Sequence, residues 1–592
     1  MRQPEDEPAT TVTRSFASKP ALWIVAASLL AIAPLMLRGN SCGHDFNFHL
    51  LSWMEVARAW QTGVWYPHWT QDANYGAGEP RFLFYPPASW LLGGLLGSAA
   101  PWTAAPALFA FLVLLGSGFS MYRLSREWLP QETATIAACL YLANPYALFT
   151  LYERSAFGEA FSEAWIPLIL LFALRRRPSI VPLGLAMAAI WLTDAPAAVL
   201  ASYMLALLTL ARSLVERKAW PALRAAASTG LGLGLAAFYI VPAAFERRWV
   251  EIGRALAPGM RVEDSFLFTQ TADSFHNQVL WTASWIFLFE MAAAAVAAAF
   301  ALKNERASRT AMAIACLLPP ILFLQFPVSA PIWDHAPELR FLQFPWRWLL
   351  FLAAAGSLLI GLALRPNGRN HPGRGEPRSI LRFWRPLTAS AAVLAMIVTA
   401  SLLFFQPCDD EDAVSAEVAA FHLGQGVEGT DEYTRAGVGN WKIQQGLPPL
   451  RILRGPAEEI AKGTSTNPPW TPGGPQNLPA DLRVAHPSAE HWTFQIEAAE
   501  RGYAVLRLMD YPAWRVTLND MDVEQRPARE DGLMVIPIAA GSSRIDVRWS
   551  NPPDILLGRA ISAVFLLVLL PLGYFEDRRL CGGRFKPSGG QV

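Results

Sequence analysis

Long apolar runs separated by short polar breaks make up most of the chain, which has 592 residues. A helix needs roughly 20 apolar residues to cross the hydrocarbon core of a membrane, and fewer where protein shields it. The pattern predicts a polytopic α-helical membrane protein with about 12–13 spans. The predicted spans are 21–37, 84–99, 102–121, 132–150, 161–174, 179–193, 196–211, 226–246, 279–302, 309–325, 346–364, 384–405 and 555–575.

Residues 406–553 break this pattern, because they are polar and contain no long apolar run. In their second half, apolar and polar positions alternate, and turn signals such as Asn519-Asp520 and Asp531-Gly532 separate the alternating runs. This alternation predicts an antiparallel β-sandwich. Residues 406–480 are weakly patterned, and 468–479 reads as a loop. The inward-facing positions are predicted to be Trp492, Phe494, Ile496, Leu506, Leu508, Val516, Leu518, Ile545, Val547 and Trp549.

The expected domain order follows from these two patterns. The first apolar run has no small-x-small cleavage site after it, so it is expected to remain as a helix. The predicted parts are a disordered cytoplasmic tail 1–20, a transmembrane domain 21–405 with an outer loop 39–83, an outer β-rich domain 406–553, a last transmembrane helix 554–576 and a cytoplasmic tail 577–592.

Basic residues predict the orientation, because loops rich in lysine and arginine remain in the cytoplasm. The basic loops lie at 175–177, 212–224, 303–309, 365–385 and 578–579. The remaining loops and the β-rich domain then face outward. In this scheme both ends of the segment 84–99 face outward, which conflicts with a crossing of the membrane. The segment is short and contains Tyr85-Pro86-Pro87 near its start. Either this segment is re-entrant or interfacial, or one helix between 151 and 212 is split or fused incorrectly.

Composition supports a membrane protein, with 53% hydrophobic residues and 16% charged residues against about 25% in soluble domains. The balance of 49 basic and 48 acidic residues gives no indication of a nucleic-acid partner. Five scattered cysteines make neither a disulfide framework nor a zinc site. Cys42 and Cys408 each follow a membrane helix, so they either pair in an oxidising space or remain two thiols.

The outer loop begins with a predicted amphipathic helix over 45–61. We expect its apolar face to lie in the membrane surface or to dock on other helices. Asp45, His49 and Ser52 are spaced i, i+4, i+7 and share one edge of that face. Asp45 is either an acid at the lipid–water boundary or a simple N-cap. The aromatic residues that follow are expected mostly as an interfacial belt, with stacking on sugars as the alternative.

Four stretches carry a resemblance to a known family. They are "GHDFNFHLLSW" with "GVWYPHWTQDANYGAGEPRFLFYPP", then "NPYALFTLYERSAFGEAFSEAWIPLIL", "LRFLQFPWRWLLF" and "YPAWRVTLND". In this order they resemble the bacterial 6-pyruvoyl-tetrahydropterin-synthase-related and YfhO-like membrane proteins. That group is similar in architecture to the C-type glycosyltransferases (GT-C), which move a sugar from a polyprenyl-phosphate carrier to an acceptor.

The resemblance implies a role for Asp45, which falls where GT-C enzymes have an acid in the first outer loop. Their usual Asp-Glu or Glu-Asp doublet is absent, since His44 and Phe46 flank Asp45. The resemblance therefore leaves the cofactor unknown, with a divalent metal neither indicated nor excluded. It implies a lipid-linked sugar donor, a cell-envelope acceptor and membrane lipids as partners. It also implies a bacterial inner membrane location with the site facing the periplasm or the cell exterior.

Sugar transfer from a phosphate carrier needs a base for the acceptor hydroxyl and cations for the departing phosphate. Asp45 is the candidate base, with His49 orienting it or contacting phosphate. Arg347 is a candidate phosphate ligand because it lies in the first turn of a helix that begins at Pro345. The alternative is that Arg347 snorkels to the interface. The candidate catalytic residues are Asp45, His49 and Glu159, and the candidate substrate-binding residues are His44, Glu153, Arg154, Glu163, Asp194 and Arg347.

Several of these residues have plainer explanations. Arg154 and the glutamates around it also fit a charged helix entry with an ion pair. Asp194 either lines the cavity or breaks the helix before Pro196. Glu290 lies near mid-membrane, where it marks a polar cavity or is hydrogen-bonded to a neighbour.

The sequence thus favours a membrane glycosyltransferase, with two alternatives from other classes. One is a lipid or polysaccharide transporter, which Glu290 favours, although no internal repeat is visible. The other is a non-catalytic membrane protein that binds glycan. No P-loop, GxGxxG, Ser/His/Asp or CxxC motif stands out.

Overall fold

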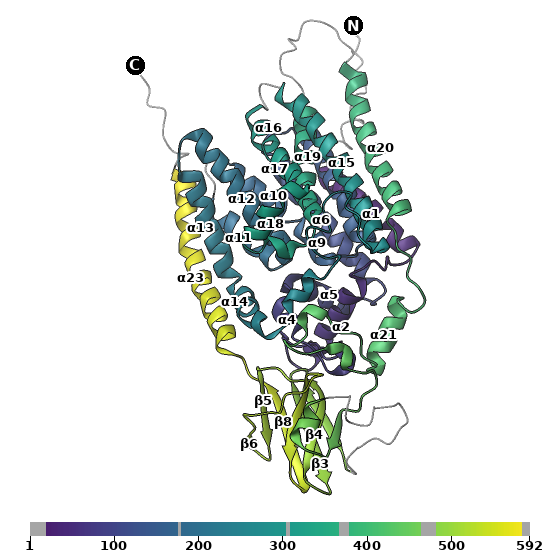
Figure 1. Cartoon of the computed structure of the whole chain (residues 1–592). Helices are drawn as coiled ribbons and strands as arrows, with labels where there is room; N and C mark the ends of the chain where they lie inside the picture. The colour runs from purple at the N-terminus through teal and green to yellow at the C-terminus, as the bar shows by residue number, and fades with distance from the viewer. Residues whose placement is uncertain (1–18, 176–178, 304–307, 366–377, 463–480, 583–592) are drawn as a thin grey trace, which may run out of the picture.

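The computed structural model describes residues 19–175, 179–303, 308–365, 378–462 and 481–582. A bundle of helices forms the larger part, and a small β-domain lies at one end of it (Figure 1). Helix α23 leaves the β-domain and runs back along the bundle. Most of the predicted tails, the loop 468–479 and much of the basic loops at 175–177, 303–309 and 365–385 lie outside the described residues. Residues 577–582 of the predicted C-terminal tail continue helix α23, which ends at Gly582.

Nine helices in the described part of the chain are long and apolar enough to cross a membrane. Short breaks divide some of them into two elements. They are α1 (Pro20–Leu37), α6 (Ala105–Ser125), α7 and α8 (Gln131–Leu142, Pro145–Tyr152), α9 and α10 (Phe157–Ser162, Ile166–Leu174), α12 (Ala195–Glu216), α15 (Ser274–Leu302), η5 and α19 (Pro345–Trp348, Leu349–Ala363), α20 (Arg378–Leu403) and α23 (Pro553–Gly582).

Two bent pairs raise the count to as many as 11 if each is one span. The first pair is bent by 77° and the second by 96°. The first comprises α13 (Trp220–Leu235), α14 (Ala237–Glu246) and η1 (Arg247–Trp249), and the second comprises α16 (Ser308–Ala315), α17 (Leu318–Phe323), η3 (Pro327–Ser329) and α18 (Ala330–His335).

The predicted count of about 12–13 spans was too high, because two predicted spans are short helices. They are α5 (Pro87–Ala99) with 13 residues and α11 (Ile180–Trp191) with 12 residues, well below the length of a span. A Cβ built on Gly93 of α5 would lie 2.1 Å from the indole of Trp53, so α5 packs closely on the outer-loop helix α2 (Phe46–Gln61). This packing favours the alternative in which 84–99 does not cross the membrane.

The remaining short elements lie in the loops and around the β-domain. They are α3 (Ala73–Gly76), α4 (Arg81–Phe84), η2 (Ile252–Leu256), η4 (Leu339–Leu342), α21 (Val414–Leu423), η6 (Asp431–Tyr433), η7 (Asn440–Lys442) and α22 (Ala457–Ala461).

The β-domain consists of two antiparallel sheets that share one apolar core, as the alternation predicted. The three-stranded sheet has the order β1-β4-β7, and the five-stranded sheet has the order β2-β3-β8-β5-β6. The strands are β1 (Leu450–Leu453), β2 (Arg483–Ser488), β3 (His491–Ala498), β4 (Gly502–Met509), β5 (Trp514–Leu518), β6 (Met521–Asp522), β7 (Leu533–Ile538) and β8 (Gly541–Trp549).

The outer loop is packed between the bundle and the β-domain and does not lie free on a membrane surface. Trp53 of α2 is fully buried and stacks on Phe109 with ring centroids 5.0 Å apart. Trp69 is buried in the core of the β-domain, 5.1 Å from the ring of Trp514. The surface-helix expectation was therefore wrong and the docking alternative holds. The prediction that the aromatic residues of this loop form an interfacial belt is also wrong for Trp69.

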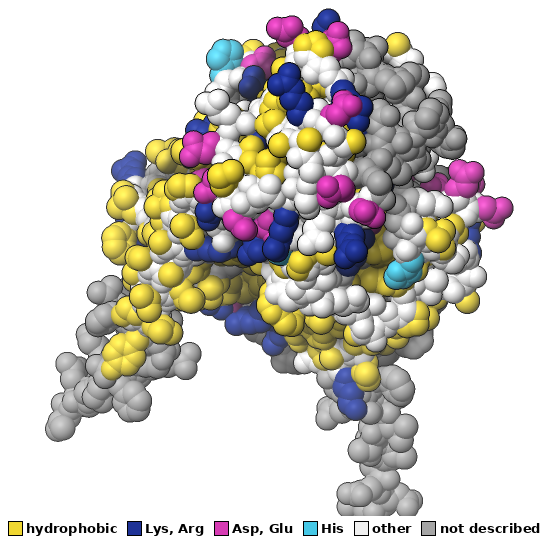
Figure 2. Space-filling model, turned by 90° about the horizontal axis from the view of Figure 1, so that it is seen from below, with side chains coloured by type: hydrophobic (Ala, Val, Ile, Leu, Met, Phe, Trp, Pro, Cys, Tyr) yellow, Lys and Arg dark blue, Asp and Glu magenta, His cyan; other side chains and the backbone are white. Residues whose placement is uncertain are grey.

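A disulfide between Cys42 and Cys408 joins the start of the outer loop to the end of α20. Of the two alternatives for these cysteines, the structure therefore has the paired one. Seen from the β-domain, acidic and basic side chains are intermixed over the near face, and hydrophobic side chains are common on the flanks (Figure 2). Helices α20 and α23 leave most of their apolar window exposed, as lipid-facing helices do.

Candidate functional site

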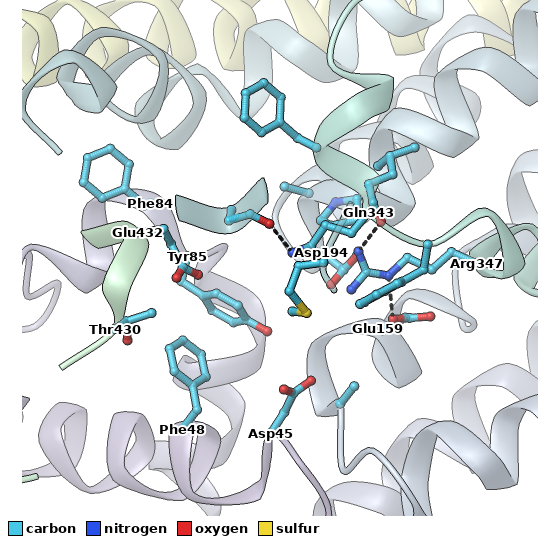
Figure 3. Close-up of a pocket in the computed structure, with 18 of the residues that line it drawn as sticks. Asp45, Phe48, Phe84, Tyr85, Glu159, Asp194, Gln343, Arg347, Thr430 and Glu432 are labelled. Carbon is cyan, nitrogen blue, oxygen red and sulfur yellow. Dashed lines mark hydrogen bonds and ion pairs between the residues drawn. The ribbon is translucent and has the colours of Figure 1, made fainter. Parts of the chain in front are cut away.

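A cavity of about 790 Å³ lies where the outer loop, the ends of several membrane helices and the segment before the β-strands meet. Its walls come from α2, from the turns around 154–159, 191–199 and 338–347, and from η6 (Figure 3). Among the predicted site residues, those that line it are His44, Asp45, His49, Arg154, Glu159, Asp194 and Arg347.

Asp45 occupies the position before the first turn of α2, but its side chain makes no capping hydrogen bond. The carboxylate is half-buried and points into the cavity (Figure 3). The N-cap alternative therefore does not describe its side chain, although its backbone has the N-cap place. The catalytic role of Asp45 remains a prediction.

Backbone contacts join the loop of Asp45 to the turn at 153–155. The Asp45 N–H donates to the carbonyl of Arg154 at 2.9 Å, and the Gly43 N–H donates to Oγ of Ser155 at 3.0 Å. A Cβ on Gly43 would lie 2.2 Å from the carbonyl oxygen of Glu153, so only glycine permits this approach. The first two sequence motifs are thus parts of one local structure.

Glu159 is the centre of a buried cluster with two cations. Arg154 Nη1 lies 2.7 Å from Glu159 Oε2, and Arg347 Nε lies 3.3 Å from the same oxygen. The hydroxyl of Tyr146 donates to the other carboxylate oxygen. Three donors engage Glu159, so its geometry favours positioning of the two guanidinium groups. Two cations on one carboxylate leave a net positive charge that suits an anion.

Arg347 is held in place from several sides. Its Nη1 donates to the carbonyl of Leu342 at 2.7 Å, and the guanidinium lies 5.0 Å from the centroid of the Phe344 ring. Trp346 and Trp348 beside it are buried. The snorkelling alternative does not describe Arg347, because its side chain faces the cavity.

Two predicted residues line the cavity without carrying a charge suited to phosphate. His49 is buried among the rings of Tyr85 and Phe157, and burial together with the charge of Arg81 lowers its pKa to about 3. It is therefore neutral and cannot serve as a cation for phosphate. The ring of His44 lies 4.7 Å from that of Phe275, and partial desolvation of the imidazole lowers its pKa.

Asp194 fulfils both of its predicted alternatives. Its Oδ1 accepts a hydrogen bond from the Ala197 N–H at 2.8 Å and so caps α12, while the residue also lines the cavity. Burial and the charge of Glu159 raise its pKa to about 6. Asp194 thus changes charge near neutral pH within the site.

Glu153 and Glu163 are not among the residues that line the cavity, so the structure does not bring them together with the other predicted substrate-binding residues. Glu153 accepts a hydrogen bond from Nε2 of Gln406 at 2.6 Å, and burial raises its pKa. Glu163 is buried between helices. Glu290, the intramembrane acid, is also buried and accepts from the Tyr146 N–H at 3.2 Å, which agrees with the hydrogen-bonded alternative.

Sequence reasoning missed Tyr85 and Glu432, which also line the cavity. Tyr85 lies within a quoted motif, near its end. Its hydroxyl lies near Asp194, because a Cβ on Gly158 would be 2.7 Å from the hydroxyl and 3.5 Å from Asp194 Oδ2. Glu432 lies in weakly patterned sequence that gave no signal. In the described residues, no group of three or more His, Cys, Asp or Glu side chains is placed to hold a metal ion.

Comparison with known proteins gives one family and one distant structural match. A family model described as "6-pyruvoyl-tetrahydropterin synthase related domain; membrane protein" matches residues 82–407, which include two of the four motifs in full. No curated protein matches the chain. Arabinofuranosyltransferase AftD from Mycobacteria matches with a TM-score of 0.39 and 18% identity over 64% of this chain. The match spans 27% of that enzyme, and it carries no conclusion about the reaction.

Proposed function

We propose that this chain, which belongs to the 6-pyruvoyl-tetrahydropterin synthase related membrane proteins, is a membrane glycosyltransferase. It moves a sugar from a polyprenyl-phosphate carrier to a cell-envelope acceptor on the outer face of the bacterial inner membrane. The observation that carries the proposal is the meeting of Asp45 with the Arg154–Glu159–Arg347 cluster in one cavity.

At the anomeric carbon of the donor sugar, one bond to oxygen forms and one breaks. The acceptor oxygen attacks the anomeric carbon of the donor sugar, and Asp45 takes the proton of the acceptor hydroxyl. The bond between that carbon and the phosphate oxygen breaks, and the polyprenyl phosphate leaves with its negative charge. Arg347 and Arg154 stabilise that charge, because guanidinium groups bind phosphate oxygens with charge-assisted hydrogen bonds.

Glu159 holds both guanidinium groups in place before the donor arrives. Such preorganisation matters because groups that need no rearrangement during the reaction stabilise developing charge most effectively. The site stays close to the predicted outer membrane surface, where a lipid-linked donor and a water-borne acceptor can meet. The name of the family refers to a pterin enzyme, but the residues of this site suit an anion and a hydroxyl group.

The test is transfer by the purified protein from a panel of polyprenyl-phosphate sugars to envelope glycan fragments. We expect transfer in the wild type and, in Arg347→Gln, at least a tenfold weaker Kd for the donor. Arg340→Gln is the matched control, since Arg340 is an exposed arginine seven residues earlier. Movement of the lipid-linked sugar across proteoliposomes without covalent transfer would instead support a transporter. Binding of glycan without either activity would support a non-catalytic protein.

A further inference from the structure

One end of the cavity takes no part in the proposed chemistry. In Figure 3, Thr430, Glu432 and Phe84 lie on the side opposite Glu159 and Arg347, and Tyr85 and Phe48 extend between them and Asp45. We call the set Phe48, Phe84, Tyr85, Glu432 and Tyr433 the aromatic end. All five residues line the cavity.

The rings of the aromatic end form two contacting pairs. Phe84 stacks on Tyr433 with centroids 5.6 Å apart and planes 15° apart. Phe48 meets Tyr85 edge to face at 4.9 Å. Flat apolar rings beside a carboxylate suit a ligand that offers C–H faces and hydroxyl donors together.

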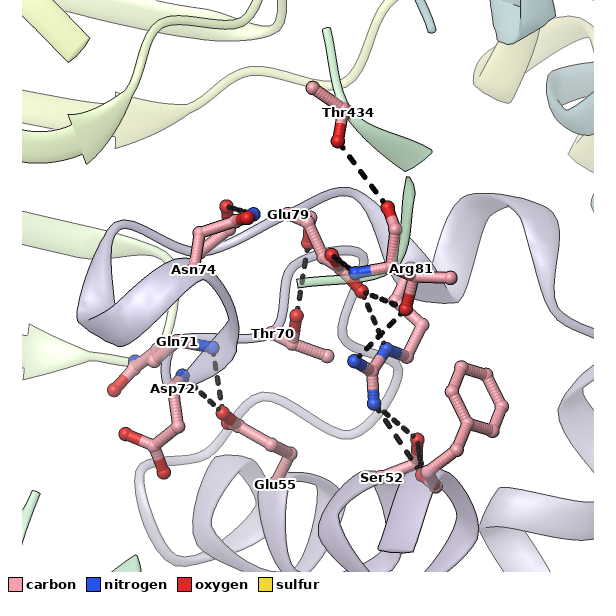
Figure 4. A network of polar contacts seen from close by, with 12 residues as sticks. Ser52, Glu55, Thr70, Gln71, Asp72, Asn74, Glu79, Arg81 and Thr434 are labelled. Atoms are coloured by element: carbon pink, nitrogen blue, oxygen red, sulfur yellow. Dashed lines mark hydrogen bonds and ion pairs between the residues drawn. The ribbon is translucent and has the colours of Figure 1, made fainter. Parts of the chain in front are cut away.

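A buried carboxylate fixes Glu432 relative to Asp45. Glu79 is fully buried and accepts hydrogen bonds from the Thr430 N–H at 2.8 Å and the Thr430 hydroxyl at 3.0 Å. Arg81 binds Glu79 at 2.7 Å and also donates to Oγ of Ser52 at 3.0 Å (Figure 4). Ser52 belongs to α2, the helix that Asp45 precedes, so this chain of contacts ties η6 to the base.

The charges of the cavity divide it into two ends. The cationic end, with Arg154 and Arg347, suits the donor phosphate. The aromatic end presents Glu432, and Asp45 and Asp194 lie between the two ends. A ligand at the aromatic end thus meets the carboxylate of Glu432, and carboxylates accept hydrogen bonds from hydroxyl groups and repel anions. The guanidinium of Arg81, 4.4 Å from the centroid of the Phe48 ring, is paired with Glu79.

We propose that the aromatic end is the acceptor subsite and that it takes an uncharged carbohydrate, whose hydroxyl groups donate to Glu432 while its ring packs on the aromatic side chains. The inference rests on the proposed glycosyl transfer and adds the class of the acceptor. It also gives the segment before the β-strands a direct part in selecting the substrate.

The test compares three ligands on one variant. Binding of neutral methyl glycosides and of decaprenyl phosphate is measured on the purified full chain, together with glucuronic acid as an anionic probe of similar size. We expect Glu432→Gln to weaken neutral glycoside binding about tenfold, as loss of a charge-assisted hydrogen bond does. Decaprenyl phosphate binding remains within about twofold, and discrimination against glucuronic acid decreases.

Glu428→Gln is the matched control, because Glu428 is an exposed glutamate four residues earlier and the substitution removes the same charge. The proposal is overturned if neutral glycosides fail to bind the wild type at millimolar concentration. It is also overturned if Glu432→Gln and Glu428→Gln bind them equally while decaprenyl phosphate binding is intact. Absence of transfer from every donor, with glycoside binding that still depends on Glu432, would contradict the glycosyltransferase function and leave a carbohydrate site.

Discussion

The side chains of the cavity divide the work between them. Glu159 accepts from Arg154, Arg347 and Tyr146, whereas Asp45 directs its carboxylate into the cavity. A base must reach the proton it removes, so the geometry makes Asp45 a better candidate for the base than Glu159. Sequence reasoning predicted both residues, but it could not separate their roles, because Arg347 is distant in sequence from Glu159.

Asp194 predicts a pH dependence of donor binding. Its pKa of about 6 lies above the ordinary value of 3.8, so it loses its negative charge as the pH falls below 6. A phosphodiester donor remains charged in this range. We expect the donor to bind roughly fivefold more tightly at pH 5 than at pH 7, because one repulsive charge disappears.

Asp194→Asn separates this effect from others, since asparagine also caps helices. The variant should bind the donor at pH 7 as tightly as the wild type does at pH 5, with little change between the two. Equal pH dependence in both proteins would show that another group titrates.

At the scale of elements, periodicity predicted the helix over 45–61, most of the long spans and several β-strands. It did not predict where α2 packs, because the space for Trp53 is made by Gly93 of another helix. Strand β7, with the sequence LMVIPI, has no alternation and was not recognised. The acidic turn η6 was missed because its position depends on a contact with Glu79, more than 300 residues earlier in the sequence.

Loss of the buried Glu79 carboxylate is expected to lower stability strongly. Removing one partner of a buried ion pair leaves the other charge unpaired, and this costs about 3–5 kcal/mol. We expect Glu79→Gln to lower the free energy of unfolding of the β-domain region by about 3 kcal/mol, measured by urea unfolding with tryptophan fluorescence. Glu500→Gln, which breaks an exposed pair with Arg454, should cost less than about 1 kcal/mol. Similar losses in both variants would contradict the role given to Glu79.

The disulfide gives a prediction at the same scale. Without reductant, Cys42 and Cys408 should resist maleimide, while the exposed Cys316 reacts. Replacing both cysteines by serine should lower stability by about 2–4 kcal/mol, because the bond closes a long loop. Labelling of Cys42 in the untreated protein from native membranes would place this end of the bundle in a reducing compartment.

At the scale of the whole molecule, the bundle, the outer loop and the β-domain meet around one cavity. Composition and apolar runs were enough to predict a polytopic membrane protein with a β-rich domain before the last helix. They overestimated the number of spans, because α5 and α11 are apolar but short. A local apolar run does not distinguish a helix that spans the membrane from one that packs inside the protein.

The most direct test of the central claim is the rate of sugar transfer in Asp45→Asn, measured in single turnovers with bound donor. Loss of a general base lowers the chemical step by about 10²–10⁴-fold, and we expect a decrease in this range with the donor Kd changed less than about threefold. Asp410→Asn, an exposed aspartate just beyond Cys408, should retain the wild-type rate. A wild-type rate of transfer in Asp45→Asn would contradict the account, because Asp45 would then not be the base.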